Sequence, residues 1–387
     1  MPMHTRRPGI RFLLFIGLAL AYSPAGAQAS AAAVPRLQLA PATGTHPEEF
    51  TFISSLRELS DGRVIASDGR ENKLLVLDFR DGSSETIGRV GRGPNEYGMV
   101  GSVLPTAGDS SLLGDFMGRR WLLLDGARIV VTVPPDDSAL KLTQGFVAGA
   151  DALGRVMQRT TSQPPVGTSE TGIHDSSAVT FISRQTGKVD TVAMVRNNPM
   201  RRQVSKNDKG EINFMSIMPV GVLVPREEPV LFADGTLAVL RIDPFRVDWR
   251  SVSGVWTRGA PLPIPRVRVD ARERAAFLER NAASYKPSPR PSPVTREPPK
   301  AGDFPEFIPP YANGTQRAGP GGTLIVRRSK SADFMQSHYF VIDRRGRLVG
   351  ELTLPANEEI VGAGPATLYV AVKDEDDIIR LRRHPWK

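Results

Sequence analysis

The stretch Asp61-Gly62-Arg63-Val64-Ile65-Ala66 decides the fold, because its pattern recurs along the chain. Each copy places a small or acidic residue and a glycine, or their equivalents, before a short apolar strand. A tight turn that contains glycine and leads into alternating or β-branched residues predicts a hairpin, and repeated hairpins are typical of arrays and propellers. The other five copies begin at Asp109, Leu153, Asp234, Gly321 and Gly364.

A second recurring turn follows five of the six copies. It lies between two further strands, so that one repeat contains two hairpins and therefore four strands. Four-stranded antiparallel sheets repeated around an axis form the blades of a propeller, and the sequence thus predicts an all-β, six-bladed β-propeller. The second turns contain Asp81-Gly82, Asp125-Gly126, Thr186-Gly187, Ser253-Gly254 and Arg345-Gly346.

The spacing of the repeats predicts insertions. The first-turn positions 62, 110, 154, 235, 322 and 366 are 44 to 48 residues apart in three intervals and 81 and 87 apart in two. The long intervals should hold a blade plus an insertion, near residues 163–175, 196–229 and 268–310. Asp270–Ala283 predicts a short helix that Asp270 caps. We expect Gln163–Asp175 and the proline-rich Tyr285–Pro310 to lie outside the blade sheets.

The sixth repeat is one strand short. Ile378–Leu381 is its third strand, and too few residues follow for a fourth. The segment Val34–Ala40 alternates apolar and polar residues, so it could pair at the open edge. We predict that this N-terminal strand pairs with Ile378–Arg382, completes the last blade and closes the ring.

Residues 1–27 have the features of a secretory signal peptide. Arg6 and Arg7 precede an apolar stretch, Phe12–Tyr22, and small residues at Ala25-Gly26-Ala27. We expect residues 28–387 to form a single domain in the periplasm or outside the cell. No later stretch is long and apolar enough for a membrane span, and the sequence contains no cysteine, so the fold must be stable without disulfides.

The net charge limits the classes of partner. The chain carries a formal charge of +9, and the three arginines before Gln28 reduce this to +6 for the exported part. This modest excess suits a small polar or anionic ligand, a protein, or an acidic polymer of the cell envelope. An exported protein rarely meets nucleic acid, so we expect no nucleic-acid partner.

A glycine-rich segment, Ile87-Gly88-Arg89-Val90-Gly91-Arg92-Gly93-Pro94-Asn95-Glu96-Tyr97, separates the first two repeats. Together with the repeated turns it resembles the bacterial exported six-bladed β-propeller family, which includes NHL-repeat-like and TolB-like propellers. In that family a Gly-x-x-Gly-x-Gly-Pro-Gly-Glu-aromatic segment joins early blades. Asn95 replaces one of its glycines, and Asn tolerates the left-handed backbone region. The resemblance implies a fold and no common catalytic chemistry.

This loop allows two interpretations. Its backbone N–H groups could hold an anion together with Arg89 and Arg92, while Asn95, Glu96 and Tyr97 complete a ligand-binding loop. Alternatively the glycines permit a turn between blades and Tyr97 packs beneath the rim. We favour the structural interpretation, because a lone glycine-rich motif is a weak signal.

A second set of candidates comes from counting six residues beyond each first-turn position, with Lys373 near the corresponding place in the last repeat. These residues should lie at the mouth of the central channel, where Arg241 and Arg328 could join Arg89 and Arg92 in an anion-binding surface. Alternatively, these residues are ordinary strand ends whose charged side chains form local salt bridges. The set is Asp68, Asp115, Thr160, Arg241, Arg328 and Lys373.

These observations predict an exported propeller for ligand binding or protein interaction, with no catalytic residues and no cofactor. The alternative is a metal-dependent hydrolase of the gluconolactonase type, with a divalent cation such as calcium in the channel. Asp68, Asp115 and Glu49 have suitable side chains but no metal-binding spacing. The sequence contains neither a Gly-x-Ser-x-Gly motif nor a cysteine nucleophile.

Overall fold

The computed structural model describes residues 34–115, 117–118, 120–133, 145–160, 173–206, 209, 212–284 and 299–386, together with Met1. Val34–Lys387 forms one compact unit, and Met1–Ala33 is a separate unit. The rest of the expected signal peptide therefore lies outside the described residues, as do residues 161–172 and 285–298 of the expected insertions.

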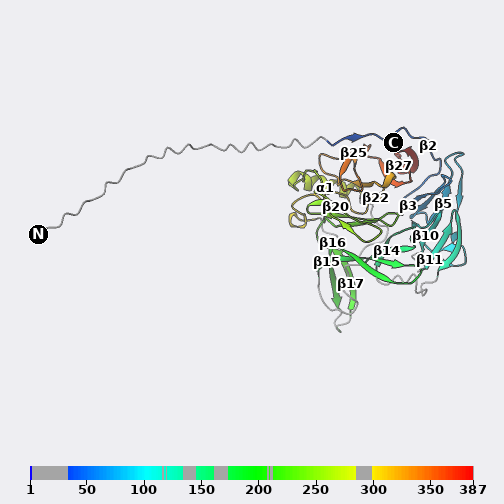
Figure 1. Ribbon diagram of the computed structural model, residues 1–387, viewed down its shortest axis with the longest axis horizontal. Coiled ribbons are helices and arrows are strands. Elements are labelled where there is room, and N and C mark those ends of the chain that lie inside the picture. The colour runs from blue at the N-terminus through cyan, green and yellow to red at the C-terminus, as the bar shows by residue number, and fades with distance from the viewer. Residues whose placement is uncertain are drawn as a thin grey trace. The chain divides into compact units, whose positions relative to one another are not determined.

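Six of the sheets formed by the described strands are the blades (Figure 1). Each blade has four antiparallel strands, which in the first five blades follow one another in the chain. The first blade contains β3 (Ile53–Glu58), β4 (Val64–Asp68), β5 (Lys73–Leu77) and β6 (Ser84–Thr86). The second contains β9 (Val100–Pro105), β10 (Ser110–Asp115), β11 (Arg120–Asp125) and β12 (Arg128–Val133). The third contains β13 (Gly145–Ala150), β14 (Arg155–Thr160), β15 (Ile173–Ser183) and β16 (Val189–Lys206).

The remaining three blades continue in chain order. The fourth contains β18 (Glu228–Leu231), β19 (Leu237–Ile242), β20 (Phe245–Arg250) and β21 (Trp256–Thr257). The fifth contains β22 (Arg317–Ala318), β23 (Leu324–Arg327), β24 (Ser337–Ile342) and β25 (Leu348–Leu354). The sixth contains β26 (Glu358–Ala363), β27 (Thr367–Lys373), β28 (Ile379–Pro385) and, from the N-terminal segment, β2 (Gly44–Thr45).

The first strands of the blades contact one another in a closed cycle. β3 contacts β9, β9 contacts β13, and the contacts continue through β18, β22 and β26 back to β3. A cycle of six innermost strands is the arrangement of a six-bladed propeller, so the predicted fold class is confirmed.

Alternation along the second strands explains why the blades stack. In β4, Val64 packs with Tyr369 of the sixth blade, whereas Ile65 packs with Leu113 of the second blade. Successive side chains of a strand point to opposite faces of its sheet, and both faces are covered here. The apolar runs that follow each first turn therefore form the layers between blades.

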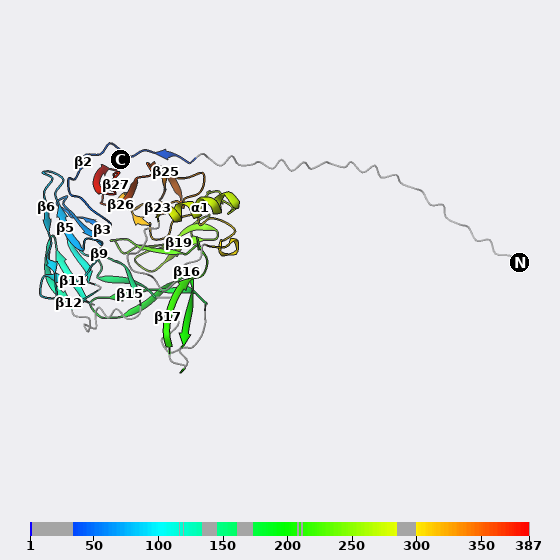
Figure 2. The same cartoon turned by 180° about the vertical axis from the view of Figure 1, so that it is seen from behind.

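The ring closes through residues 43–50. β2 pairs antiparallel with β28, and the backbone N–H groups of Thr43 and His46 donate to the carbonyls of Arg383 and Leu381 at 2.8 Å each. Further along, Phe50 forms an antiparallel bridge to the first residue of β28. Figure 2 shows β2 beside the C-terminal end of the chain. The prediction that an N-terminal strand completes the last blade is confirmed.

The predicted segment, however, was wrong. Within Val34–Ala40, β1 (Arg36–Leu37) pairs in parallel with β25 of the fifth blade and not with β28. Leu37 packs directly over Gly350 of β25, where a Cβ atom would overlap the leucine side chain. The alternating pattern identified a strand correctly, but alternation carries no information about which of two exposed edges a strand joins.

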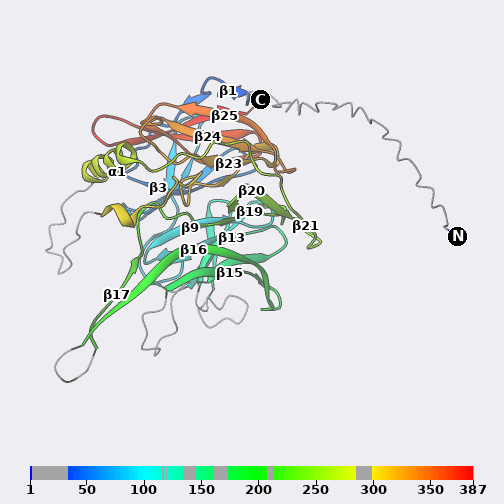
Figure 3. The ribbon, with the colours of Figure 1, turned by 90° about the vertical axis from the view of Figure 1, so that its left-hand side faces the viewer.

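The insertion in the third repeat lengthens the third blade. β15 and β16 run beyond the end of β14, and β17 (Ile212–Pro219) adds a fifth strand to this sheet (Figure 3). Ile173–Asp175 belongs to β15, so the expectation that Gln163–Asp175 lies wholly outside the sheets was wrong at its C-terminal end. Most of the predicted insertion 196–229 is part of this long hairpin.

The last insertion contains a helix, α1 (Ala271–Ser284), close to the predicted span. Asp270 caps it, since its Oδ1 accepts the N–H of Glu273 at 2.9 Å. Two short 3₁₀ turns, Ala301–Asp303 and Pro320–Gly322, follow before and within the fifth blade. Among the described residues, no helix is long and apolar enough to cross a membrane.

Removing the closing segment tests this topology. We expect a chain that begins at residue 48 to lose at least about 2 kcal/mol of unfolding free energy, because the hydrogen bonds of β2 are lost and the edge of β28 is exposed. A chain that begins at residue 41 loses β1 alone and should lose less. Urea denaturation of both chains, compared with one that begins at residue 28, gives the ranking, and the reverse ranking would contradict this closure.

Candidate functional site

One face of the propeller collects the residues that strand counting selected. The second strands β4, β10, β14, β19, β23 and β27 occupy equivalent positions, so their C-terminal ends emerge on the same face. We call this the loop face, because the connections between successive blades also lie there. Asp68, Asp115, Thr160, Arg241 and Lys373 lie at or next to the ends of these strands, and Arg328 follows β23.

Asp68 is a buried tie between two loops. Its Oδ2 accepts the backbone N–H groups of Thr51 and Phe52 at 2.6 and 3.2 Å, and its Oδ1 accepts those of Arg70 and Glu71, each at 2.9 Å. Two of these N–H groups lie just before β3 and two lie just after β4. The carboxylate therefore fixes the entry to β3 against the turn after β4.

Asp115 has the same role in the second blade. Its Oδ1 accepts the N–H groups of Gly98, Met99 and Gly118 at 2.9–3.0 Å, and its Oδ2 pairs with the guanidinium of Arg120 at 3.0 Å. Burial raises the pKa of the Asp115 carboxyl, but these hydrogen bonds outweigh burial and hold the pKa below its usual value.

The glycine-rich loop is bonded internally. Its ends form a two-residue parallel pair, β7 (Arg89–Val90) with β8 (Glu96–Tyr97). Glu96 accepts the N–H of Gly93 and the Nε–H of Arg89, each at 2.7 Å, and these bonds lower the pKa of its carboxyl. Asn95 has a φ of 60°, as its expected tolerance of left-handed backbone requires.

Two further contacts explain the loop's sequence. The Tyr97 ring is buried, and its hydroxyl accepts the N–H of Leu74 at 3.2 Å. Gly91 leaves room for the Glu96 carboxylate, which a Cβ atom at this position would overlap. Arg89 and Arg92 stay exposed at the surface of the loop face. These contacts favour the structural interpretation of the loop.

The other counted residues have different surroundings. Arg241 is held by Glu227 at 2.7 Å and by Asp248 at 3.1 Å, so its charge is balanced within the chain. Lys373 pairs with Asp377. Arg328 has no ion pair within the described residues and lies 3.8 Å above the Phe334 ring. The three cations therefore do not form a common cluster.

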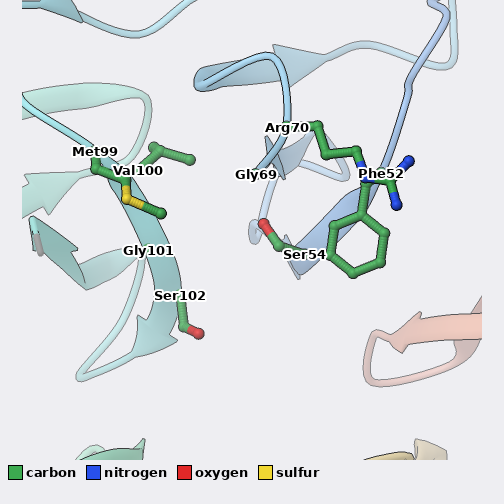
Figure 4. Close-up of a pocket in the computed structure, with 8 residues that line it drawn as sticks. All are labelled: Phe52, Ser54, Gly69, Arg70, Met99, Val100, Gly101 and Ser102. Carbon is green, nitrogen blue, oxygen red and sulfur yellow. The ribbon is translucent and has the colours of Figure 1, made fainter. Parts of the chain in front are cut away.

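A pocket of about 400 Å³ lies on the loop face between the entries to β3 and β9. Figure 4 shows Phe52, Ser54 and Arg70 on one wall and Met99 and Ser102 on the other. We call it the mouth pocket, because β3 and β9 belong to the innermost ring of strands. Its lining is Phe52, Ser54, Gly69, Arg70, Met99, Val100, Gly101 and Ser102.

The mouth pocket combines apolar surface with one cation. Phe52 and Met99 are 49% and 41% exposed, although both are large and apolar. The guanidinium carbon of Arg70 lies 5.8 Å from the centre of the Phe52 ring. Arg70 forms no ion pair with any residue in the described part of the chain, so its charge is available to a ligand.

Sequence reasoning selected the two aspartates that hold the loops of the mouth pocket, but it missed the residues that line the pocket. Asp68 holds Phe52 and Arg70, and Asp115 holds Met99, but none of these three lining residues was a candidate. Phe52 and Met99 each directly precede the first strand of a blade. A comparison of the repeats at this position, rather than at the strand ends alone, would have found two large apolar residues at equivalent exposed sites.

The three carboxylates of the hydrolase alternative are engaged in other contacts within the chain. Asp68 and Asp115 are bonded to backbone N–H groups as described, and Glu49 pairs with Arg380. Within the described residues, no group of three or more Asp, Glu and His side chains is arranged to hold a metal ion.

Solved structures with a similar course of the chain are propellers. Regucalcin, a calcium-binding protein of Agrobacterium tumefaciens, is 10% identical, with coverage of 91% of this chain and 97% of that one and a TM-score of 0.42. Virginiamycin B lyase of Staphylococcus aureus is 11% identical, with coverage of 86% of this chain and 95% of that one and a TM-score of 0.39. A Bacteroides fragilis protein provisionally described as exported is 8% identical, with coverage of 91% of this chain and 98% of that one and a TM-score of 0.47.

By sequence, neither a family model nor a curated protein matches this chain. At identities of this order the likeness concerns the fold alone. The resemblance to six-bladed propellers is confirmed, and it rests on the six blades of the chain itself.

The tie formed by Asp115 can be tested by stability. We expect Asp115→Asn to lower the unfolding free energy at pH 7 by about 2 kcal/mol, because an amide cannot accept all these hydrogen bonds. The folded-state pKa of Asp115 is depressed, so its stabilisation is complete above the unfolded value of about 3.9 and is lost as the pH falls through the folded value.

Urea denaturation between pH 7 and pH 3 measures both effects. The variant should show a shallower loss of stability with acid than the wild type. Asp125→Asn, at the exposed end of β11, is the matched control and should change neither quantity. Equal effects of the two substitutions would contradict the role of Asp115.

Proposed function

We propose that this protein is an exported binding protein whose mouth pocket takes a small ligand with an anionic group and an apolar body. The observation that carries the proposal is Arg70 beside the exposed Phe52, two side chains on backbone that Asp68 holds in place. As proposed, binding uses side chains of the chain itself and requires no cofactor.

The charge of Arg70 supports an anionic ligand. A guanidinium offers a planar fork of N–H donors that matches a carboxylate or phosphate group. The nearest acidic residue in sequence, Glu71, accepts a hydrogen bond from the Thr51 hydroxyl at 3.0 Å and faces Lys73 at 3.9 Å. Arg70 is thus left to meet an external anion.

The apolar wall supports a ligand that is more than a bare ion. Large exposed apolar side chains that gather at a concave surface mark binding sites more often than they mark ordinary surface. Phe52 and Met99 face one pocket from two blades, so both could be covered by the same molecule. A volume of about 400 Å³ suits a small molecule.

The ties favour binding because they reduce its entropic cost. Four N–H groups bonded to Asp68 and three bonded to Asp115 fix the two loops that carry the lining before any ligand arrives. A pocket whose backbone is already ordered loses less conformational freedom on binding.

The expected location also supports this class of function. The signal peptide predicted at residues 1–27 would deliver the protein to the periplasm or the outside of the cell. There the loop face would be accessible to small solutes or to a protein or cell-envelope partner.

Arg70→Ala tests the proposal with phenylacetate as the probe and phenylacetamide as its uncharged analogue. We expect the wild type to bind phenylacetate and the variant to bind it at least about tenfold more weakly, because a charge-assisted hydrogen bond is lost. Added salt should weaken wild-type binding as well. Isothermal titration calorimetry measures the dissociation constants.

Arg80→Ala is the matched control. Arg80 is 70% exposed and pairs with Asp78 in the turn after β5, away from the mouth pocket. The control should bind phenylacetate as the wild type does. If phenylacetate and phenylacetamide bind equally well, or Arg80→Ala weakens binding as much as Arg70→Ala, the proposed site is wrong.

A further inference from the structure

A second cavity, of about 370 Å³, lies over the fourth and fifth blades. Three segments form most of its wall: the β19–β20 turn at 242–245, the connection 261–267 and the stretch 305–310 that follows α1. The loop after β23, residues 328–331, closes one side. We call it the proline-walled cavity, after its lining residues Pro225, Pro244, Pro261, Pro265, Pro305, Pro309 and Pro310.

Three arginines line the proline-walled cavity: Arg196, Arg266 and Arg328. Within the described residues none of them forms an ion pair. The guanidinium carbon of Arg266 lies 3.8 Å from the centre of the Phe307 ring, and that of Arg328 lies 3.8 Å from the centre of the Phe334 ring. Stacking on a ring face leaves the N–H groups at the edge of the guanidinium plane free to donate.

The acidic groups on the lining do not balance these cations. They are Asp243 and Glu306, and Glu306 also faces Arg268 outside the cavity, at 3.8 Å. Burial lowers the pKa of Arg328, while attraction to Glu351 opposes this shift. A partly desolvated cation that lacks a close counter-ion is unfavourable, and an anionic ligand would relieve it.

Ser331 provides an independent observation. Ser331 is one of the lining residues and is 1% exposed, yet its hydroxyl has no hydrogen-bond partner within the described residues. A buried hydroxyl without a partner is rare in folded proteins and calls for an explanation. A ligand acceptor at this position would supply the missing hydrogen bond.

The loop that carries Ser331 is positioned by α1. Oε2 of the buried Glu273 accepts the N–H of Ala332 at 2.8 Å, and Arg272 pairs with Asp333. The insertion therefore holds the loop on which Arg328 and Ser331 lie. Helix and loop are fixed before a ligand binds, which lowers the cost of ordering the site.

We propose that the proline-walled cavity is a second binding site, for a small molecule that carries a phosphate or a pair of carboxylates on an apolar body. Three guanidinium groups and one hydroxyl match a dianionic group better than a single negative charge. Leu262, Ile264 and Ile308, together with the prolines, provide the apolar wall. The site is independent of the mouth pocket, which belongs to the first and second blades.

Calorimetric titration of the full chain with phenyl phosphate, phthalate and phenol tests the proposal. Phenyl phosphate or phthalate should bind and phenol should not, and the stronger of the two anions identifies the dianionic group. Arg266→Ala combined with Arg328→Ala should weaken that binding at least about tenfold, because two charged donors are lost. Arg80→Ala, in the turn after β5 and not part of this cavity's lining, is the matched control and should bind as the wild type does.

Ser331→Ala separates binding from folding. Since the hydroxyl has no partner in the free protein, its removal should leave the melting temperature unchanged or raise it, while binding of the anion weakens about threefold to tenfold. The titrations are repeated in the Arg70→Ala chain, because the mouth pocket is itself proposed to take an anionic group on an apolar body. The binding that remains in that chain belongs to the proline-walled cavity and should still be weakened by Ser331→Ala. Binding of neither anion, equal binding of phenol, or an equal loss with Arg80→Ala would overturn the proposal.

Discussion

The backbone hydrogen bonds between residues 43–50 and β28 are the interaction on which the rest of the propeller depends. Every other blade is completed by strands that follow one another closely in the chain, but the sixth takes its outermost strand from the N-terminal segment. This pairing joins the two ends of the domain, so the cycle of innermost strands from β3 to β26 can close. Without it β28 would present an open edge, and the layer between the sixth and first blades would lose its cover.

Closure also decides what the loop face can do. The residues just before β3 leave the pairing with β28 at Phe50 and meet Asp68 at Thr51 and Phe52. The position of Phe52 in the mouth pocket thus follows from ring closure on one side and from a buried carboxylate on the other. Asp68 and Asp115, at the strand ends, could be taken for ligand-binding groups. Their hydrogen bonds instead hold the backbone that carries the lining residues of the mouth pocket.

Much of the fold could be predicted because its signals are local. Glycines such as Gly62 and Gly235, with φ of 84° and 88°, mark the turns, and the apolar runs after them mark the layers between blades. The sheet edge that an N-terminal strand joins, by contrast, depends on residues far away in the chain. The pattern of Val34–Ala40 predicts a strand, but the packing of Leu37 over Gly350 assigns it to the fifth blade. Counting selected Arg241, which lies within β19, and Arg328, which follows β23, but their partners depend on residues from other segments, which counting cannot reveal.

The contrast between these two arginines shows how the surplus of positive charge is distributed. Arg241 lies among Glu227, Asp248 and Arg246, an arrangement in which each cation has a carboxylate within 3.1 Å. Arg328 and Arg266 have aromatic rings in place of carboxylates. A ring attracts a cation without neutralising it, so the guanidinium is held in position while its charge still acts on its surroundings. The net charge of the chain therefore says little about function, and the arginines that stack rather than pair indicate where an anion would be most strongly stabilised.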